Sequence, residues 1–255
     1  MKKNLLIAVY FAIGITAHAQ SLIGGKQILK TNLSADALKN YNLTYERSLN
    51  HFMSVSISYS SMSKRDIPLQ FLAKSIINND NIDFDNFKIA NDAITVESRF
   101  YLGLQKMSGF YIAPYARFAN LDLGIPIHYS YNTISGNQIA TTNTTALLNG
   151  TISSKSLGAY MGMQFQLLTK LVLDFWIVGG HYGSSSGKLQ YNAPVGTSQA
   201  ALTELKNTID QTKVSPFHLN SSIVQNNDGT STVITNTDGP WAGIRAAGIT
   251  VGLRF

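Results

Sequence analysis

Histidine and serine are the residue types in this chain that are able to carry nucleophilic catalysis or to bind a metal ion. A lipid-modifying enzyme of the serine type needs a histidine beside a serine and an acid, and the nearest approach here is His181 followed by serines at 184–186. Such a juxtaposition arises easily by chance in a serine-rich chain. His51, His128 and His218 are distant in sequence and lack the His-x-x-x-His or Glu-x-x-His spacing of zinc sites. We therefore expect no catalytic residue, no metal and no cofactor, and a protein that is not an enzyme.

A second set of chemically capable residues is charged, and its members share the polar parity of alternating segments. This set comprises Lys30, Glu46, Glu97, Arg99, Arg117, Asp174 and Arg254. Five large aromatic residues are expected beside them: Tyr101, Tyr111, Tyr115, Tyr160 and Trp176. Four positive and three negative charges are able to neutralise one another in an interior, where an unpaired charge is costly. This near balance favours a structural plug of ion pairs and rings, and a selective pore is the alternative.

The elements that position these residues are eight segments in which apolar and polar residues alternate, as in strands with one dry and one wet face. The clearest is 52–60, where four apolar residues alternate with four serines. The last segment ends on an aromatic residue, Phe255. Arg47 and Arg245 fall in the apolar parity, near strand ends. The predicted strands are 28–36, 40–49, 52–60, 93–102, a strand beginning at 109, 154–168, 171–182 and 248–255.

The connections between these strands are short after the second, fourth and sixth strands and long after the third, fifth and seventh. The long ones are 61–92, 123–153 and 183–240. This asymmetry is typical of outer-membrane barrels, which have short periplasmic turns and long extracellular loops. We therefore predict an all-β fold, an eight-stranded antiparallel up-and-down transmembrane β-barrel with long extracellular loops and both termini on the periplasmic side.

A soluble eight-stranded barrel, with apolar residues inside and polar residues outside, is the alternative fold. Only 13% of the residues are charged, whereas about a quarter are charged in soluble domains. So few charges would be sparse on a soluble surface but are able to pair inside a membrane barrel. The composition therefore favours the membrane barrel.

The long loops carry a few local signals. A short helix is expected near Pro68, and 123–153 is rich in Asn, Thr and Ser without a periodic pattern. In the longest loop, Asn227-Asp228-Gly229 predicts a hairpin turn. A short amphipathic helix is predicted there from the spacing of Ala201, Leu202, Leu205 and Ile209. We expect this loop to fold over the rim of the barrel.

The N-terminal residues have the pattern of a signal peptide. Lys2 and Lys3 precede an apolar run at 5–15, and Ala17-His18-Ala19 fits the small-x-small cleavage rule. We expect 1–19 to be a signal peptide and 20–255 a single outer-membrane β-barrel domain. The chain has no cysteine, which excludes disulfides and thiolate metal sites. Its formal charge of +6 is scattered, so no nucleic-acid partner is expected.

Together with the alternating strands and Phe255, the segments Tyr45-Glu46-Arg47-Ser48-Leu49 and Gly109-Phe110-Tyr111-Ile112-Ala113-Pro114-Tyr115 resemble small bacterial outer-membrane barrels of the OmpA/OmpX-like group, in particular its uncharacterised members. The resemblance implies insertion by the barrel assembly machinery, with Phe255 as the assembly signal. It carries no catalytic residues to transfer.

The expected function is that of a non-enzymatic integral protein of the cell outer membrane, with a plugged lumen. Its expected partners are outer-membrane lipid, the barrel assembly machinery and a surface ligand held by loops 61–92, 123–153 and 183–240. These loops would serve surface interaction or membrane integrity. Two alternatives stay open: a passive, porin-like channel or transporter for small or hydrophobic solutes, and a lipid-modifying barrel enzyme.

Overall fold

A computed structural model describes residues 25–68, 70–77, 79–103, 105–135, 138–212, 214 and 216–255. The predicted signal peptide, 1–19, lies outside the described residues. The strands are β1 Gln27–Asn32, β2 Tyr41–Ser48, β3 Met53–Asp66, β4 Lys88–Tyr101, β5 Gly109–Ser135, β6 Gln138–Gln166, β7 Leu171–Ala193, β8 His218–Gln225, β9 Ser231–Arg245 and β10 Gly248–Arg254. The helices are α2 Leu33–Ala37, α3 Gln70–Ile77 and α4 Gln199–Gln211. No helix of the described residues is long and apolar enough to cross a membrane.

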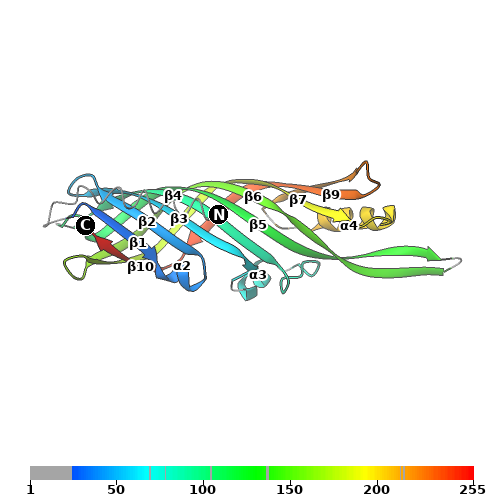
Figure 1. The fold of residues 1–255 in the computed structure, drawn as a ribbon, viewed down its shortest axis with the longest axis horizontal. Helices are drawn as coiled ribbons and strands as arrows, with labels where there is room; N and C mark the ends of the chain where they lie inside the picture. The colour runs from blue at the N-terminus through cyan, green and yellow to red at the C-terminus, as the bar shows by residue number, and fades with distance from the viewer. Residues whose placement is uncertain are drawn as a thin grey trace.

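Eight of the strands form a closed antiparallel ring. The strands from β1 to β7 pair in chain order, and β10 joins the two ends of this row by pairing with both β1 and β7. Short turns join the strands at the end where the C-terminus lies, and the longest strands extend from the other end (Figure 1). The predicted all-β antiparallel fold is thus confirmed.

The first predicted strand is too long, because 33–37 forms the short helix α2. The side chain of Asn32 accepts a hydrogen bond from the backbone N–H of Ala35 and so caps the helix. The Asp36 side chain then accepts a bond from the backbone N–H of Asn42 on β2. α2 therefore continues along the edge of β2 beyond the end of β1.

The polarity of the ring is the reverse of that in a water-soluble barrel. On β3, four serines at 54, 56, 58 and 60 are at most 7% exposed, whereas Ile57 and Tyr59 between them are each 51% exposed. The same alternation places Val96 of β4 and Leu253 of β10 outside. Because side chains of a strand alternate between faces, the ring has an apolar outer surface and a polar interior.

The strand that pairs with β7 on the side away from β6 is interrupted. β9 pairs with β7 as far as Arg245 opposite Gly179, and β10 begins again with Gly248 opposite Trp176. The indole N–H of Trp176 donates to the carbonyl oxygen of Ala246 at the break, at 2.6 Å. The alternation changes parity here, because residues 246 and 247 are both exposed.

This parity change corrects one prediction. Arg245 was assigned to the lipid-facing parity, but its guanidinium points into the ring and reaches Glu97. Arg47, the other arginine of that parity, is exposed as predicted. A break of two residues therefore turns one charge from the outside to the inside.

The predicted patternless loop 123–153 is wrong: 123–135 and 138–153 are paired strands that form the outer part of the β5–β6 hairpin. The predicted hairpin around Asn227-Asp228-Gly229 is confirmed by the β8–β9 pairing. The predicted helix of the longest loop is α4, and the predicted short helix near Pro68 is α3, which begins at Gln70.

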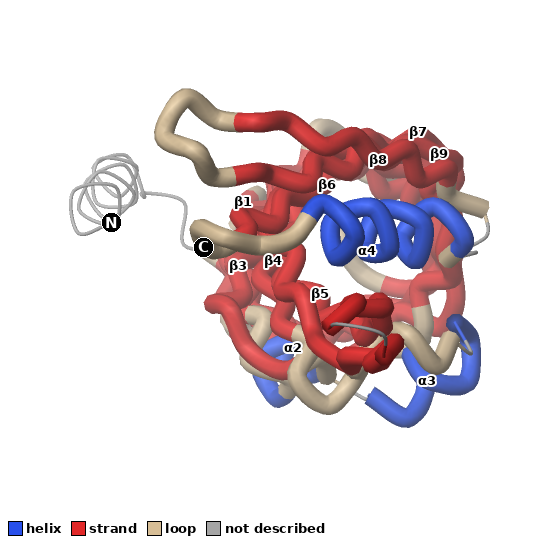
Figure 2. The backbone as a smooth tube through the Cα atoms, turned by 90° about the vertical axis from the view of Figure 1, so that its right-hand side faces the viewer, coloured by secondary structure: helices blue, strands red, loops and turns tan. Residues whose placement is uncertain are grey.

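Beyond the ring, the extended strands and α4 make a second hydrophobic core, which we call the outer module. Four buried residues of α4 pack in it with β5, β6, β7 and β9: Ala201, Leu202, Leu205 and Ile209. α4 lies among the extended parts of the strands, beyond the ring and not against its rim (Figures 1 and 2). Burial raises the pKa of Tyr129 to about 12, so this ring stays neutral within the module.

Candidate functional site

The interior of the ring holds a buried cluster of six charges, which we call the ion network: Lys30, Glu46, Glu97, Arg99, Asp174 and Arg245. The six residues occupy inward positions of five strands: Glu97 and Arg99 are both on β4, and the others lie one each on β1, β2, β7 and β9. Three cations face three carboxylates, so the cluster is neutral as a whole. The five members other than Arg245 are at most 4% exposed.

Asp174 is the carboxylate that joins the two sides of the network. Its Oδ2 accepts from Arg99 at 2.5 Å and from Lys30 at 3.0 Å. Its Oδ1 accepts from the hydroxyl of Tyr111 at 2.6 Å. Lys30 also pairs with Glu46, whose Oε1 accepts from Ser54 and Tyr101. All four carboxylate oxygens of Asp174 and Glu46 therefore have a cationic or hydroxyl partner.

Glu97 and the aromatic rings complete the network on the side that faces the outer module. Glu97 accepts from Arg99, from the hydroxyl of Tyr160 at 2.7 Å and from Arg245 at 3.4 Å. The guanidinium of Arg245 lies 4.4 Å from the centre of the Tyr160 ring and 4.9 Å from that of Trp176. Such contacts are favourable when the cation is desolvated. The charges and rings thus fill one level of the interior.

The structure brings together five of the seven predicted interior charges and separates the other two. Arg254 is buried near the C-terminal end, where it donates to Gln166 at 2.6 Å and to the carbonyl of Gly25 at 2.7 Å. Arg117 is partly buried and donates to Thr95 Oγ1 at 3.4 Å. Neither is within ion-pair distance of a carboxylate in the described residues. The assignment of Arg117 and Arg254 to one charge network is therefore corrected.

The predicted aromatic residues line the interior. Tyr101, Tyr111, Tyr115 and Tyr160 are at most 5% exposed, and Trp176 is 8% exposed. Neighbouring rings are 5.4–6.4 Å apart between centres. The predicted assembly signal, Phe255, has a 41% exposed side chain, and its backbone is hydrogen-bonded to Gln27.

A cavity of about 390 Å³ lies beside the ion network, on the side that faces the outer module. We call this cavity the upper pocket, and "above" means nearer to the outer module. Tyr115, Arg117, His181 and Arg245 supply its polar side. The remaining lining is mostly apolar and includes residues from β3, β4, β5 and β9. The Tyr115 hydroxyl and His181 Nδ1 are 3.3 Å apart. This pocket combines the guanidinium groups of Arg117 and Arg245 with a mostly apolar lining.

No hydrogen bond of the described structure joins His181 to a serine. Ser184 and Ser186 point outward, whereas Ser185 is buried and donates to the carbonyl oxygen of Gly239 at 3.3 Å. In the described residues, no group of three His, Cys, Asp or Glu side chains is placed to hold a metal ion. In the described structure the imidazole of His181 therefore contacts the hydroxyl of Tyr115, and Ser185 bonds to the backbone of β9.

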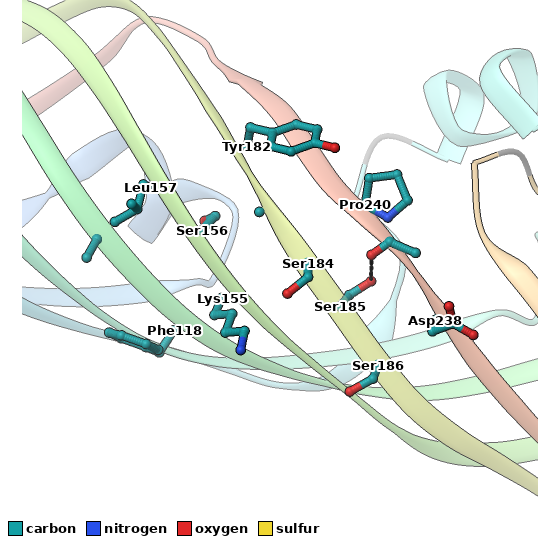
Figure 3. Close-up of a pocket in the computed structure, with 13 residues that line it drawn as sticks. Phe118, Lys155, Ser156, Leu157, Tyr182, Ser184, Ser185, Ser186, Asp238 and Pro240 are labelled. Carbon is teal, nitrogen blue, oxygen red and sulfur yellow. Dashed lines mark hydrogen bonds between the residues drawn. The ribbon is translucent and has the colours of Figure 1, made fainter.

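A second hollow of about 970 Å³ lies on the outer face of the sheet (Figure 3). Phe118, Lys155 and Ser184 come from neighbouring strands β5, β6 and β7, and Asp238 lies on β9 at its edge. It is broad and open and is rich in small residues. Its single lysine, Lys155, is exposed.

A family model described as "Protein of unknown function (DUF3575)" matches residues 5–215 of the chain. A comparison with curated proteins finds no match.

Proposed function

Because the chain belongs to the DUF3575 family of proteins of unknown function, we propose its role from the geometry of the ring: a non-enzymatic β-barrel of the bacterial outer membrane with a plugged lumen. The observation that carries this proposal is the reversed polarity of a closed ring. Large apolar side chains are exposed on the outside, and the ion network is buried inside. In hydrocarbon every backbone polar group needs an internal partner, and a closed ring of strands provides one.

The plug follows from the size and charge of the interior. An eight-stranded barrel is just wide enough for side chains to fill it. Here six charged groups and five aromatic rings occupy the interior of the ring, and the ion pairs among Lys30, Arg99 and Asp174 are buried from solvent. Opening a pore through this interior would separate buried ion pairs, which costs several kcal/mol. This arrangement supports a closed lumen.

The outer module supports a role at the cell surface. Its own hydrophobic core and the cap of Ser198 on α4 give it a defined shape. Exposed loops on rigid scaffolds are common positions for binding. In this proposal the barrel assembly machinery inserts the chain, outer-membrane lipid surrounds it, and the outer module contacts a surface partner.

Detergent gel mobility of the outer-membrane fraction tests the membrane barrel. A folded barrel resists cold detergent, so unboiled and boiled samples should migrate differently. Orientation is tested with an epitope tag in the β8–β9 turn at Asp228, which should bind antibody on intact cells. The matched control is a tag in the short β6–β7 turn at Thr169, which should bind only after lysis. A protein that stays in the soluble periplasmic fraction would refute the proposal.

Planar-bilayer recording tests the plug. The native protein should give no reproducible single-channel steps. Arg99→Ala removes the cation that contacts Glu97 and Asp174 and should produce steps or excess current noise. Lys155→Ala, on the outer face, is the control and should behave as the native protein. Stable steps from the native protein would favour the channel function.

A further inference from the structure

The charge of the interior is unequal between its levels. The ion network pairs three cations with three carboxylates, so it leaves no negative charge over. Arg117 lies above it, and no carboxylate of the described residues is within 4.0 Å of its guanidinium. A partly buried cation without a counter-charge is costly. The upper pocket therefore carries an excess positive charge that an anion would neutralise.

Several groups of the upper pocket are suited to an anionic head group. Arg117 presents donors that are not used by a carboxylate, and its guanidinium fork matches carboxylate and phosphate oxygens. His181 lies on the same polar side, and Arg245 adds positive charge. Glu97 is the facing carboxylate, and it is already bonded to Arg99, Arg245 and Tyr160.

Beside this pocket, strand pairing around the ring is interrupted in the described residues. The segment 239–245 of β9 pairs with β7 on one edge only, because β8 reaches no further than Asp238 and β1 has ended at Asn32. In the described chain no strand covers the other edge of 239–245. Leu38, after α2, and Ile244, on β9, both line the pocket from opposite sides of this opening.

Exposed apolar side chains flank the opening on its outer side, where the guanidinium of Arg65 also donates to the carbonyl oxygen of Leu38 at 3.1 Å. Ile244 is 83% exposed, Leu38 is 43% exposed and Tyr41 of β2 is 64% exposed. Just below it, the backbone N–H of Ile249 donates to Ser34 Oγ at 2.9 Å, which closes the wall between α2 and β10. The gap therefore joins a cationic pocket inside the ring to the apolar outer surface.

We propose that the upper pocket binds an amphiphile with an anionic head group, whose head contacts Arg117 and whose single hydrocarbon chain leaves through the gap between β9 and α2. The head is a carboxylate or a phosphate, as in a fatty acid or a lysophospholipid. The inference rests on the proposed function, because the emerging chain would lie in the bilayer. Trp241, which lines the pocket, would lie beside the ligand.

Fluorescence quenching of the full chain in a maltoside detergent tests the proposal, with bromine on the hydrocarbon chain as the quencher. The probes are 9,10-dibromostearate, a brominated lysophosphatidylglycerol and, as the neutral control, the methyl ester of dibromostearate. Saturable quenching by one or both anionic probes, but not by the ester, is expected. The probe that binds identifies the head group, and equal quenching by the ester would overturn the proposal.

Two substitutions separate head-group contact from partition into the detergent. Arg117→Gln should weaken the binding of the anionic probe about 10-fold or more, as expected for loss of a hydrogen bond to a charged group, and Arg117→Lys should restore part of it. Lys155→Gln, on the outer face, should bind as the native protein. Trp241→Phe should remove most of the saturable signal.

Gel mobility is recorded for each variant, so that failure of the fold is distinguished from failure of binding. Heat-modifiable Arg117→Gln protein that binds the anionic probes with native affinity would overturn the site. A native protein that binds as expected but is absent from the outer-membrane fraction would refute the proposed function and leave the pocket assignment in place.

Discussion

Loss of the Asp174 carboxylate is the perturbation that tests whether ion pairing stabilises the interior of the ring. Asp174 is fully buried and accepts from Arg99, Lys30 and Tyr111. Asp174→Asn keeps the size of the side chain but leaves three cations, Lys30, Arg99 and Arg245, facing two carboxylates. Removing one partner of a buried ion pair typically costs about 3–5 kcal/mol. The ratio of folded to unfolded protein should therefore fall between about 10²- and 10⁴-fold.

The assay is equilibrium unfolding by urea in lipid vesicles, followed by tryptophan fluorescence and checked by gel mobility. The double variant Asp174→Asn with Lys30→Gln has two cations and two carboxylates and should regain a large part of the lost free energy of unfolding. Asp85→Asn is the control, because Asp85 forms an exposed pair with Lys74. Exposed pairs contribute about 0–1 kcal/mol.

The reasoning is refuted if Asp174→Asn unfolds at the same urea concentration as Asp85→Asn. It is also refuted if the double variant is less stable than the sum of the two single changes predicts. Either result would mean that packing of the aromatic rings, and not charge balance, stabilises this level of the interior.

Two further substitutions test the packing of the ring and of the outer module. A Cβ on Gly248 would overlap the ring of Trp176, so Gly248→Ala should lower the free energy of unfolding by about 1–3 kcal/mol. Gly180→Ala should leave it nearly unchanged in the same urea assay, because the nearest atom to its Cβ is 3.7 Å away; equal losses would contradict this packing. Leu205→Ala, at a fully buried position of α4, should destabilise the outer module by about 2–5 kcal/mol, seen as faster proteolysis of α4 with unchanged gel mobility of the ring. Exposed Glu204→Ala is its control, and equal cleavage of both variants would argue against the second core.

The sequence predicted the strands best where only one of their faces is polar. On β3 the serines and apolar residues alternate strictly, so the period of two fixes both the element and its inward face. α4 was predicted for the same kind of reason, since its four buried residues recur at helical spacing. The outer parts of β5 and β6 were missed because Thr, Ser and Asn occur there on both faces. Backbone pairing continues that hairpin, and the buried contacts of Ile127, Tyr129 and Leu148 form only when the fold brings α4 and the other extended strands beside it.

The sequence by itself determined the alternation, and therefore the residue types on each face of the ring and the set of charges available to its interior. The tertiary structure alone decided which of those charges meet. Arg99 and Asp174 are in contact although they are 75 residues apart, whereas Arg117 has the same inward parity but no carboxylate of the described residues within 4.0 Å of its guanidinium. The physical reason is that parity is a local property of each strand, but height along the ring depends on the register between strands. Arg245 shows that parity itself can also depend on the tertiary structure. The break at 246–247, on either side of which β9 and β10 pair with β7, turns Arg245 inward, and no local sequence pattern encodes this break.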